Sequence, residues 1–343
     1  EETMIPLITC LMAQELGAPP ELPREFRAAW VATVDNIDYP SKPGLPLAQM
    51  QGELTQIVNA AERLGLNAII FQIRPHGDSF YKSQLEPWSY YLTGEQAKAP
   101  GDNWDPLKQL VDEAHAKGIE VHVWFNPYRA NHFAQKGPIH ASHIARTHPE
   151  VVYDYGTFKW MDPGAKVVQD RSYNVFLDVV KRYDIDGVHI DDYFYPYPVR
   201  QEGKLVPFPD HKTYADYRSR GGKLTISDWR RKNVDDFVER VYKGIKTEKP
   251  WVKFGISPFG IYRPGIPAGI TAGVDQYEDL AADCLKWFRE GWCDYFTPQL
   301  YWPIEQEKQS FPVLLNYWRE QNPKGRHLWP GLFTSQVDPG GAK

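Results

Sequence analysis

The chain has 343 residues, which is long enough for one large domain or two ordinary ones. It is 42% hydrophobic and 24% charged, so it can bury a core, and this composition excludes an intrinsically disordered chain. The net charge is −5 and no basic run occurs, which argues against a nucleic-acid partner, because phosphates require clustered Lys and Arg. Aromatic residues make up 14% of the chain, and such rings serve either core packing or stacking on sugars.

The N-terminal segment has the character of a leader. The run IPLITCLMA (residues 5–13) is apolar but too short to span a bilayer, so we predict no transmembrane segment. It is typical of the end of a secretory signal peptide, and LITC also resembles a lipoprotein cleavage box ending at Cys10. We therefore expect residues 1–23 to be a signal remnant or flexible linker and residues 24–343 to form the catalytic domain. The expected location is periplasmic, outer-membrane-associated or extracellular, with a lipid anchor as an alternative to a free protein.

Apolar runs with strand character alternate with helical periodicity from residue 26 onward. The predicted strands are 26–34, 67–75, 120–128, 186–194, 252–260, 294–303 and 327–333. The predicted helices are 46–66, 105–119, 166–185, 227–249, 274–292 and 311–321, and Ser227 is the predicted N-cap of the fourth. Strands with helices between them imply a parallel sheet, either an open doubly wound sheet or a βα barrel.

Two features favour the barrel. No GxGxxG or P-loop motif follows the first strand, which weakens the nucleotide-binding alternative, and polar or aromatic clusters follow nearly every strand. We therefore predict an α/β fold, a (β/α)8 TIM-type barrel that is truncated before its eighth strand. The long connections 129–165 and 195–226 are expected to carry function, because loops of this length are uncommon in compact domains.

The parity of the strands predicts a polar set at one end of the barrel lumen. Barrel strands alternate between lumen and helix layer, so the apolar Val188 and Ile190 turn His189 and Asp191 inward. The same argument and the positions just above the strand ends predict a set of cleft residues that bind substrate. They are Arg74, His76, Asn126, Tyr128, Arg129, His189, Tyr193, Gln299, Tyr301 and Trp302. Buried polar groups need partners, so this set favours a functional pocket over a plain core.

The dipeptide Asp191-Asp192 is the predicted catalytic centre. Glycoside hydrolysis needs one carboxylic acid to protonate the leaving oxygen and a second group as base, nucleophile or charge stabiliser. Two close carboxylates push their pKa values apart, so one can stay protonated near neutral pH. Neighbours on a regular strand point to opposite faces, so Asp192 requires a twist, or else a third carboxylate completes the site. The candidates for a third carboxylate are Asp35, Asp38, Asp78 and Glu305.

Two alternatives stay open at this point. His76, His122, His189 and Asp191 could converge on a metal ion in a metal-dependent hydrolase, although no HxH or HExxH motif supports this. A non-catalytic glycan-binding barrel would keep the aromatic residues without needing the acidic dipeptide. The prediction that we carry forward is carboxylate chemistry with no cofactor and no metal.

The stretch DGVHIDDY (186–193) is similar to the D-G-x-D-x-D-x-E motif of family-eighteen chitinases. It keeps Asp186, Gly187 and Asp191 of that motif. His189 replaces one Asp, and Tyr193 stands at the position of the acidic Glu. This departure argues against the same mechanism with the same acid, and a route that uses an N-acetyl group of the substrate as nucleophile has no further support.

Longer blocks resemble the bacterial glycosyl-hydrolase-like family ten, which includes divisome-localised glycosyl hydrolases. The blocks are REFRAAWVATVDNIDYPSKPGL, NAIIFQIRPHGDSFYKSQLEPWSYYLTG, HVWFNPYRA, DGVHIDDYFYPYP, DWRRKNVDDFV, KPWVKFGISPFGIYRP and GWCDYFTPQLYW. The resemblance implies a βα barrel in an exported or lipid-anchored bacterial protein that hydrolyses glycan strands. It implies peptidoglycan stripped of its stem peptides, or a related N-acetylhexosamine polymer, as the substrate. It also implies Asp191 and Asp192 as the acidic centre.

Overall fold

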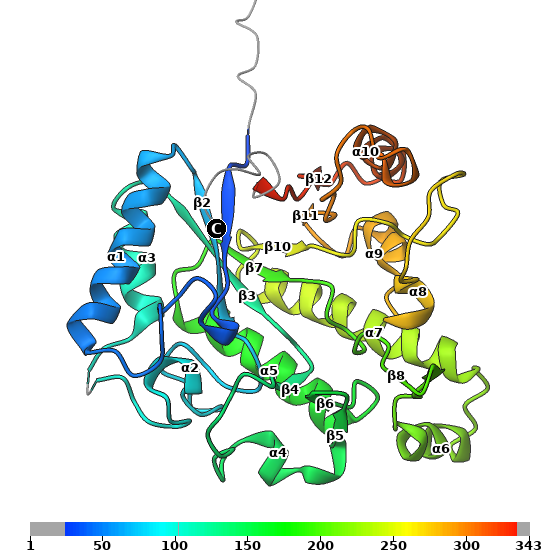
Figure 1. Ribbon diagram of the computed structural model, residues 1–343, viewed down its shortest axis with the longest axis horizontal. Helices are drawn as coiled ribbons and strands as arrows, with labels where there is room; N and C mark the ends of the chain where they lie inside the picture. The colour runs from blue at the N-terminus through cyan, green and yellow to red at the C-terminus, as the bar shows by residue number, and fades with distance from the viewer. Residues whose placement is uncertain (1–24, 102, 335–343) are drawn as a thin grey trace, which may run out of the picture.

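The computed structural model describes residues 25–101 and 103–334. The predicted leader at 5–13 and Cys10 therefore lie outside the described residues. Within the described part, no helix is both long and apolar enough to cross a membrane. Strands gather at the centre of the molecule and helices pack around them (Figure 1).

The central sheet contains seven strands in the order β1-β2-β3-β7-β10-β11-β12. They are β1 (Ala28–Val31), β2 (Ala68–Arg74), β3 (Glu120–Phe125), β7 (Gly187–Ile190), β10 (Lys253–Ile256), β11 (Tyr295–Phe296) and β12 (His327–Leu328). Every pairing between neighbours in this sheet is parallel. The strands follow each other around the sheet in chain order and curl into a partly closed barrel. The predicted α/β fold, a (β/α)8-type barrel with seven of its strands, is confirmed.

Helices connect successive strands and cover the outside of the sheet (Figure 1). They are α1 (Leu47–Arg63), α2 (Tyr90–Thr93), α3 (Pro106–His115), α4 (Ile144–Thr147), α5 (Lys166–Arg182), α6 (His211–Ser219), α7 (Ile226–Glu248), α8 (Gln276–Asp279), α9 (Cys284–Glu290) and α10 (Phe311–Glu320). Short 3-10 turns lie at η1 (Val34–Asn36), η2 (Pro149–Val151) and η3 (Glu307–Gln309). The long helices α1, α3, α5, α7 and α10 match predicted helices to within a few residues at each end.

Two predictions about the helices are wrong. The predicted helix 274–292 consists of two pieces, α8 and α9, because Ala281 between them has a φ of 52°, which an α-helix does not permit. The N-cap of α7 is Thr225 and not Ser227. The Thr225 hydroxyl accepts a hydrogen bond from the backbone N–H of Asp228 at 3.2 Å, so Ser227 lies inside the first turn.

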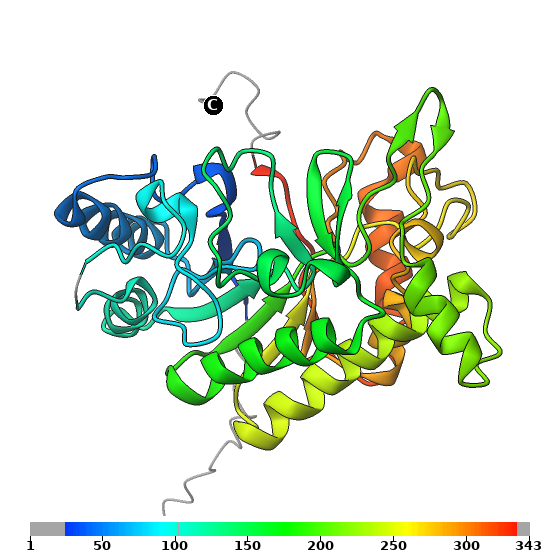
Figure 2. The ribbon, with the colours of Figure 1, turned by 90° about the horizontal axis from the view of Figure 1, so that it is seen from below.

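The two long connections are themselves folded. Between β3 and α5, three strands form an antiparallel sheet in the order β4-β6-β5: β4 (Arg129–Asn131), β5 (Val152–Tyr155) and β6 (Phe158–Met161). Between β7 and α7 lie α6 and a hairpin of β8 (Arg200–Gln201) and β9 (Lys204–Leu205). Both connections begin at the carboxyl ends of sheet strands, and Figure 2 shows the molecule from below the view of Figure 1.

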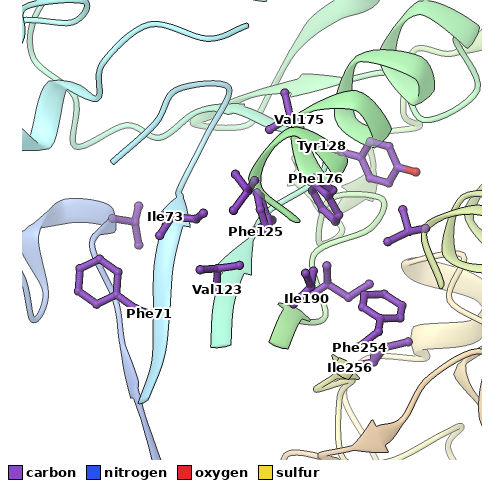
Figure 3. Close-up of a cluster of buried hydrophobic side chains, with 14 of the residues drawn as sticks. Phe71, Ile73, Val123, Phe125, Tyr128, Val175, Phe176, Ile190, Phe254 and Ile256 are labelled. Carbon is purple, nitrogen blue, oxygen red and sulfur yellow. The ribbon is translucent and has the colours of Figure 1, made fainter. Parts of the chain in front are cut away.

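The hydrophobic core lies between the sheet and the helices. Figure 3 shows Phe71, Val123, Phe125 and Ile190 of three sheet strands gathered with Phe176 of α5. The rings of Phe125 and Phe176 are stacked with centroids 4.1 Å apart. Each fully buried side chain of this size stabilises the fold by about 1.5–3 kcal/mol. These apolar positions face the helices, as the strand parity predicted, which leaves the alternate positions to the lumen.

Candidate active site

Asp191 and Asp192 directly follow Ile190, the last residue of β7. In a regular strand, neighbouring side chains point to opposite faces. Because β7 ends before Asp191, this alternation does not apply to Asp191 and Asp192. Asp192 lies in a bend beyond the strand. Both residues are nearly buried, with 6% and 5% of their surface exposed. We refer to Asp191 and Asp192 as the carboxylate pair.

The carboxylate of Asp191 accepts hydrogen bonds from N–H groups alone. Nδ2 of Asn126 lies 2.9 and 2.8 Å from its two oxygens. Nε1 of Trp124 lies 3.2 Å from Oδ2, and the backbone N of Tyr193 lies 3.2 Å from Oδ1. The indole and backbone groups cannot accept a proton, and the amide presents its nitrogen, so these surroundings stabilise the ionised form of Asp191.

The orientation of the Asn126 amide is fixed by its other neighbours. Its Oδ1 accepts hydrogen bonds from Nη2 of Arg129 at 2.9 Å and from Nε2 of Gln72 at 2.7 Å. A guanidinium can only donate, so the amide nitrogen of Asn126 must face Asp191. Gln72 is oriented in turn by the backbone N–H groups of residues 33–34, both 2.8 Å from its Oε1. A relay of amides therefore runs from the turn after β1 to the carboxylate pair.

Asp192 has a different kind of partner. The hydroxyl of Tyr197 donates a short hydrogen bond to Oδ2 of Asp192, and a hydroxyl can also accept one. Asp192 therefore has a neighbour that tolerates either of its protonation states. Asp191 does not, because a proton on it would face N–H donors.

Burial and mutual repulsion raise the pKa values of the carboxylate pair. Burial raises the pKa of Asp191 to about 7, with repulsion from Asp192 adding to the shift and the charge of Arg129 opposing it. Burial also raises the pKa of Asp192, while the Tyr197 hydroxyl opposes that shift. Two groups coupled in this way titrate as a pair, and the raised pKa values let the pair keep a proton to higher pH than isolated carboxyl groups do. The N–H donors favour the negative charge on Asp191 and therefore the proton on Asp192.

Part of the predicted cleft set surrounds the carboxylate pair. The guanidinium of Arg129 lies 5.0 Å from the ring centre of Tyr193. Gln299 donates a hydrogen bond to the backbone oxygen of Ser257 at 3.0 Å, and its side chain also lowers the pKa of Asp192. Burial and then the charges of the carboxylate pair raise the pKa of Tyr301 to about 12. The residues brought together at this end of the barrel are Asn126, Arg129, Tyr193, Gln299 and Tyr301, whereas Trp302 packs on Phe259 with ring centroids 5.8 Å apart.

Arg74, His76 and Tyr128 are fully buried, and within the described residues none of them hydrogen-bonds to Asp191 or Asp192. Nε and Nη2 of Arg74 lie 2.7 and 2.6 Å from the carboxylate oxygens of Glu86, so its charge is paired inside the protein. Tyr128 packs on Phe237 in the helix-facing core, with ring centroids 5.3 Å apart; Figure 3 shows Tyr128 among these core side chains. The predicted role of these three residues in the cleft is therefore corrected.

His189 lies deeper in the lumen, as its parity predicted, and has no exposed surface. Its Nε2 is 3.2 Å from Nε1 of Trp30 and 2.8 Å from Oγ of Ser257, and its Nδ1 is 3.0 Å from the hydroxyl of Tyr295. An indole N–H can only donate, so Nε2 accepts and the proton of the ring is on Nδ1. Burial lowers the pKa of His189 well below its usual value, so the ring stays neutral and serves the lumen network.

The residues of the metal-site alternative do not converge on one point, although His122 and His189 share the hydroxyl of Tyr295 as a partner. His122 bonds to the hydroxyl of Tyr295 at 2.8 Å and to Glu120 at 3.1 Å. His76 lies beside Asp78, with 3.7 Å between Nδ1 and Oδ2. Among residues 25–101 and 103–334, no group of three His, Cys, Asp or Glu side chains could hold a metal ion. The geometry therefore offers this alternative no ligand set.

The candidates for a third carboxylate have surroundings of their own. Asp38 accepts a backbone N–H at 2.7 Å and so shapes the turn after β1. Asp78 is fully buried, whereas Asp35 and Glu305 are exposed on the loops after β1 and β11. In the described part of the chain, none of the four makes a hydrogen bond to Asp191 or Asp192.

Comparison with known proteins identifies the family. Residues 25–342 match the family model described as Glycosyl hydrolase-like 10. The chain belongs to this family. It is 42% identical over 322 residues to Glycosyl hydrolase YngK of Bacillus subtilis (strain 168), covering 92% of this chain and 62% of that protein. It is 34% identical over 332 residues to Glycosyl hydrolase DigH of Escherichia coli (strain K12), covering 91% of this chain and 74% of that protein.

The chain thus spans less than two thirds of the length of the Bacillus relative. Among solved structures, a cycloisomaltooligosaccharide glucanotransferase of Paenibacillus sp. aligns with a TM-score of 0.50. The alignment covers 90% of this chain and 38% of that one, at 10% sequence identity. At such low identity the likeness shows a shared fold and nothing about activity. Membership of Glycosyl hydrolase-like 10 supports a glycoside hydrolase-like protein.

Three residues of the site in this Glycosyl hydrolase-like 10 chain were missing from the predicted set: Gln72, Trp124 and Tyr197. The strand pattern does predict that Gln72 and Trp124 point inward, but the predicted substrate-binding set did not include them. Tyr197 lies beyond β7 on an irregular segment, where no periodicity indicates which way a side chain points. Only the folded chain shows that its hydroxyl reaches Asp192.

Proposed function

We propose that this chain is a glycoside hydrolase that cleaves glycosidic bonds in bacterial cell-wall glycan. The proposed substrate is peptidoglycan strands that lack stem peptides. The observation that carries the proposal is the carboxylate pair, two adjacent buried carboxyl groups of which Asp191 is held by N–H donors and Asp192 by the hydroxyl of Tyr197. Membership of Glycosyl hydrolase-like 10 supports glycosidic chemistry.

In the proposed reaction, Asp192 gives its proton to the oxygen of the leaving sugar as the glycosidic C–O bond breaks. Positive charge develops at the anomeric carbon, and the ionised Asp191 stabilises it. The N–H donors of Asn126, Trp124 and Tyr193 hold that negative charge in place. Water then adds its oxygen to the anomeric carbon, and the proton that it loses restores the single proton of the carboxylate pair.

A location outside the cytoplasm forms part of the proposal, because the cell wall lies there. The apolar run at 5–13 and the cleavage box at Cys10 support export, with a lipid anchor as one route to retention at the membrane. Cleft residues that combine polar groups with rings, such as Arg129, Tyr193 and Tyr301, support a sugar substrate.

The proposal is tested by incubating the protein with glycan strands from which an amidase has removed the stem peptides, and by measuring new reducing ends. We expect release by the wild type. Asp191→Asn and Asp192→Asn should each lower the rate by roughly 10²–10⁴-fold, the usual contribution of general acid–base catalysis, while the variants stay folded. Asp236→Asn, an exposed carboxylate on α7, is the matched control and should keep the activity. Near-normal rates in both Asp variants would exclude the mechanism, and strand binding without release would indicate a non-catalytic glycan-binding barrel.

A further inference from the structure

Large apolar rings stay exposed at the carboxyl end of the barrel. Phe133 is 54% exposed, Tyr301 37% and Phe333 47%. Phe133 follows β4 in the connection after β3, whereas Tyr301 and Phe333 follow β11 and β12. All three therefore belong to segments that leave the sheet at the same end as the carboxylate pair. Exposed apolar rings beside polar groups are typical of a binding surface.

A line of rings leads from the carboxylate pair to Phe133. Tyr193, which directly follows the pair, has its ring centroid 6.2 Å from that of Trp160. Trp160 lies 6.2 Å from Phe158, and Phe158 lies 5.9 Å from Phe133. His132 packs on Phe133 with centroids 4.2 Å apart, and burial lowers the pKa of His132 to about 4, so its ring is neutral at pH 7. We call Phe133, Phe158 and His132 the Phe133 platform.

A second group of rings lies next to the carboxylate pair on the other side. The ring centroids of Tyr301 and Phe333 are 5.7 Å apart. The charges of the carboxylate pair add to the effect of burial in raising the pKa of Tyr301, which shows that its phenol lies within electrostatic reach of them. We call Tyr301 and Phe333 the Tyr301 platform.

The order of the strands places the two platforms on opposite sides of the pair. In the sheet, β7 lies between β3 on one side and β10 and β11 on the other. The Phe133 platform comes from the connection after β3, the carboxylate pair ends β7, and the Tyr301 platform follows β11 and β12. A sugar ring presents an apolar C–H face on which an aromatic ring can stack, while its hydroxyl groups bind to polar neighbours. Exposed rings on both sides of the carboxylate pair therefore fit a chain of sugars that crosses it.

We propose that the Phe133 and Tyr301 platforms are glycan-binding subsites on either side of the cleavage point. The protein then holds an extended glycan and cuts it internally, in place of removing sugars from an end. The inference rests on the proposed function and adds the length of polymer that the site recognises. The partner is a linear polysaccharide, because a single sugar would reach only one platform.

The test measures binding in an Asp192→Asn background, where hydrolysis is suppressed. The probes are long glycan strands without stem peptides and the N-acetylglucosaminyl-N-acetylmuramic acid disaccharide. Adding Phe133→Ala should weaken the binding of long strands roughly tenfold, which corresponds to about 1.4 kcal/mol, and leave that of the disaccharide unchanged. Trp251→Ala is the matched control, since Trp251 is 67% exposed but precedes β10 at the opposite end of the barrel. This variant should bind both probes as the background protein does.

Two results would overturn the inference. The first is equal affinity of the background protein and its Phe133→Ala variant for long strands, including the case in which neither binds. The second is a hydrolysis time course in which the active enzyme releases only terminal disaccharides from the start and no fragments of intermediate length. Binding is measured without hydrolysis, so the two proposals can fail separately. If the wild type does not hydrolyse the strands but Phe133→Ala still weakens their binding, the proposed function is refuted and the subsites are supported.

Discussion

Two charged clusters lie at the carboxyl ends of strands in the same sheet, one after β2 and one after β7. After β2, Arg74 and Glu86 form a doubly hydrogen-bonded ion pair with no exposed side-chain surface. After β7, the carboxylate pair keeps some exposure, and neither carboxylate forms an ion pair with a Lys or Arg of the described chain. A charge that is buried and fully paired has no capacity left for a ligand. Two neighbouring carboxyl groups that hold a proton at a partly exposed position can transfer that proton to a substrate.

The β2 cluster also contains strongly shifted pKa values, so such shifts do not by themselves mark a functional site. Burial raises the pKa of Asp78 to about 8 and lowers that of His76 well below its usual value. Both groups are therefore neutral at pH 7, and neither has exposed surface. Two features distinguish the carboxylate pair: it keeps some exposure to solvent, and the hydrogen-bond donors around Asp191 differ from those around Asp192.

The largest expected effect tests whether the Arg74–Glu86 pair is structural. Glu86→Gln leaves the guanidinium of Arg74 buried without its counter-charge, which should destabilise the fold by about 3–5 kcal/mol. The matched control is Glu239→Gln, whose partner Lys243 is exposed, and this change should cost less than about 1 kcal/mol. Chemical denaturation measures both. A Glu86→Gln protein that unfolds normally but loses its turnover would instead place this ion pair in the reaction.

The next prediction uses the buried Asp78. Its folded-state pKa is raised above the unfolded value, so the folded protein holds a proton that the unfolded chain releases as pH rises. The contribution of Asp78 to stability is therefore fully present below pH 3.8 and is lost towards pH 8. Asp78→Asn cannot ionise, so its stability relative to wild type should increase by about 2–3 kcal/mol between pH 5 and pH 7. Asp154→Asn, at an exposed pair with Lys159, should show no such change. A stability difference between Asp78→Asn and wild type that stays constant with pH would mean that Asp78 is ionised in the folded protein.

Within the site, the amide relay should set the acid limit of activity. Asn126→Leu keeps the size of the side chain but removes both amide bonds to Asp191. The ionised form of Asp191 then loses stabilisation, so its pKa rises and the acid limb of the pH–rate profile moves to higher pH. The rate at the optimum should fall roughly 10–100-fold, the range for a hydrogen bond to a charged group. An unchanged acid limb would show that Asp191 does not have to be ionised.

The smallest expected effect concerns Asp192 and the alkaline limit. The pKa of about 7 for Asp191, which belongs to the coupled pair, predicts that wild-type activity falls as pH rises above neutrality and the pair loses its proton. Tyr197→Phe removes the hydroxyl that stabilises ionised Asp192, so the alkaline limb should move up by roughly one pH unit. Tyr153→Phe, whose hydroxyl bonds to a backbone oxygen, is the control and should leave the profile unchanged. A downward shift in Tyr197→Phe would reverse the assigned direction of that hydrogen bond.

The succession of strands and helices was predictable because each long element carries its own periodic pattern. The helices α1, α3, α5, α7 and α10 and the sheet strands appear where apolar spacing placed them. The break at Ala281 was not predictable, since the residues around it have ordinary helical spacing and only the backbone conformation shows the interruption. The folded pieces of 129–165 and 195–226 were also missed, because short strands there lack a clear alternation.

The sequence by itself determined which residues stand at the carboxyl ends of the strands, because alternation along a barrel strand is a local property. That argument placed Asn126, His189 and Asp191 in the lumen. Only the tertiary structure decided which strand ends stay open. Arg74, His76 and Tyr128 are covered by segments distant in sequence or packed into the helix-facing core, whereas Asp191 and Asp192 keep a small exposed surface. Solvent access and the direction of each donor depend on contacts between segments far apart in the chain, which no local pattern encodes.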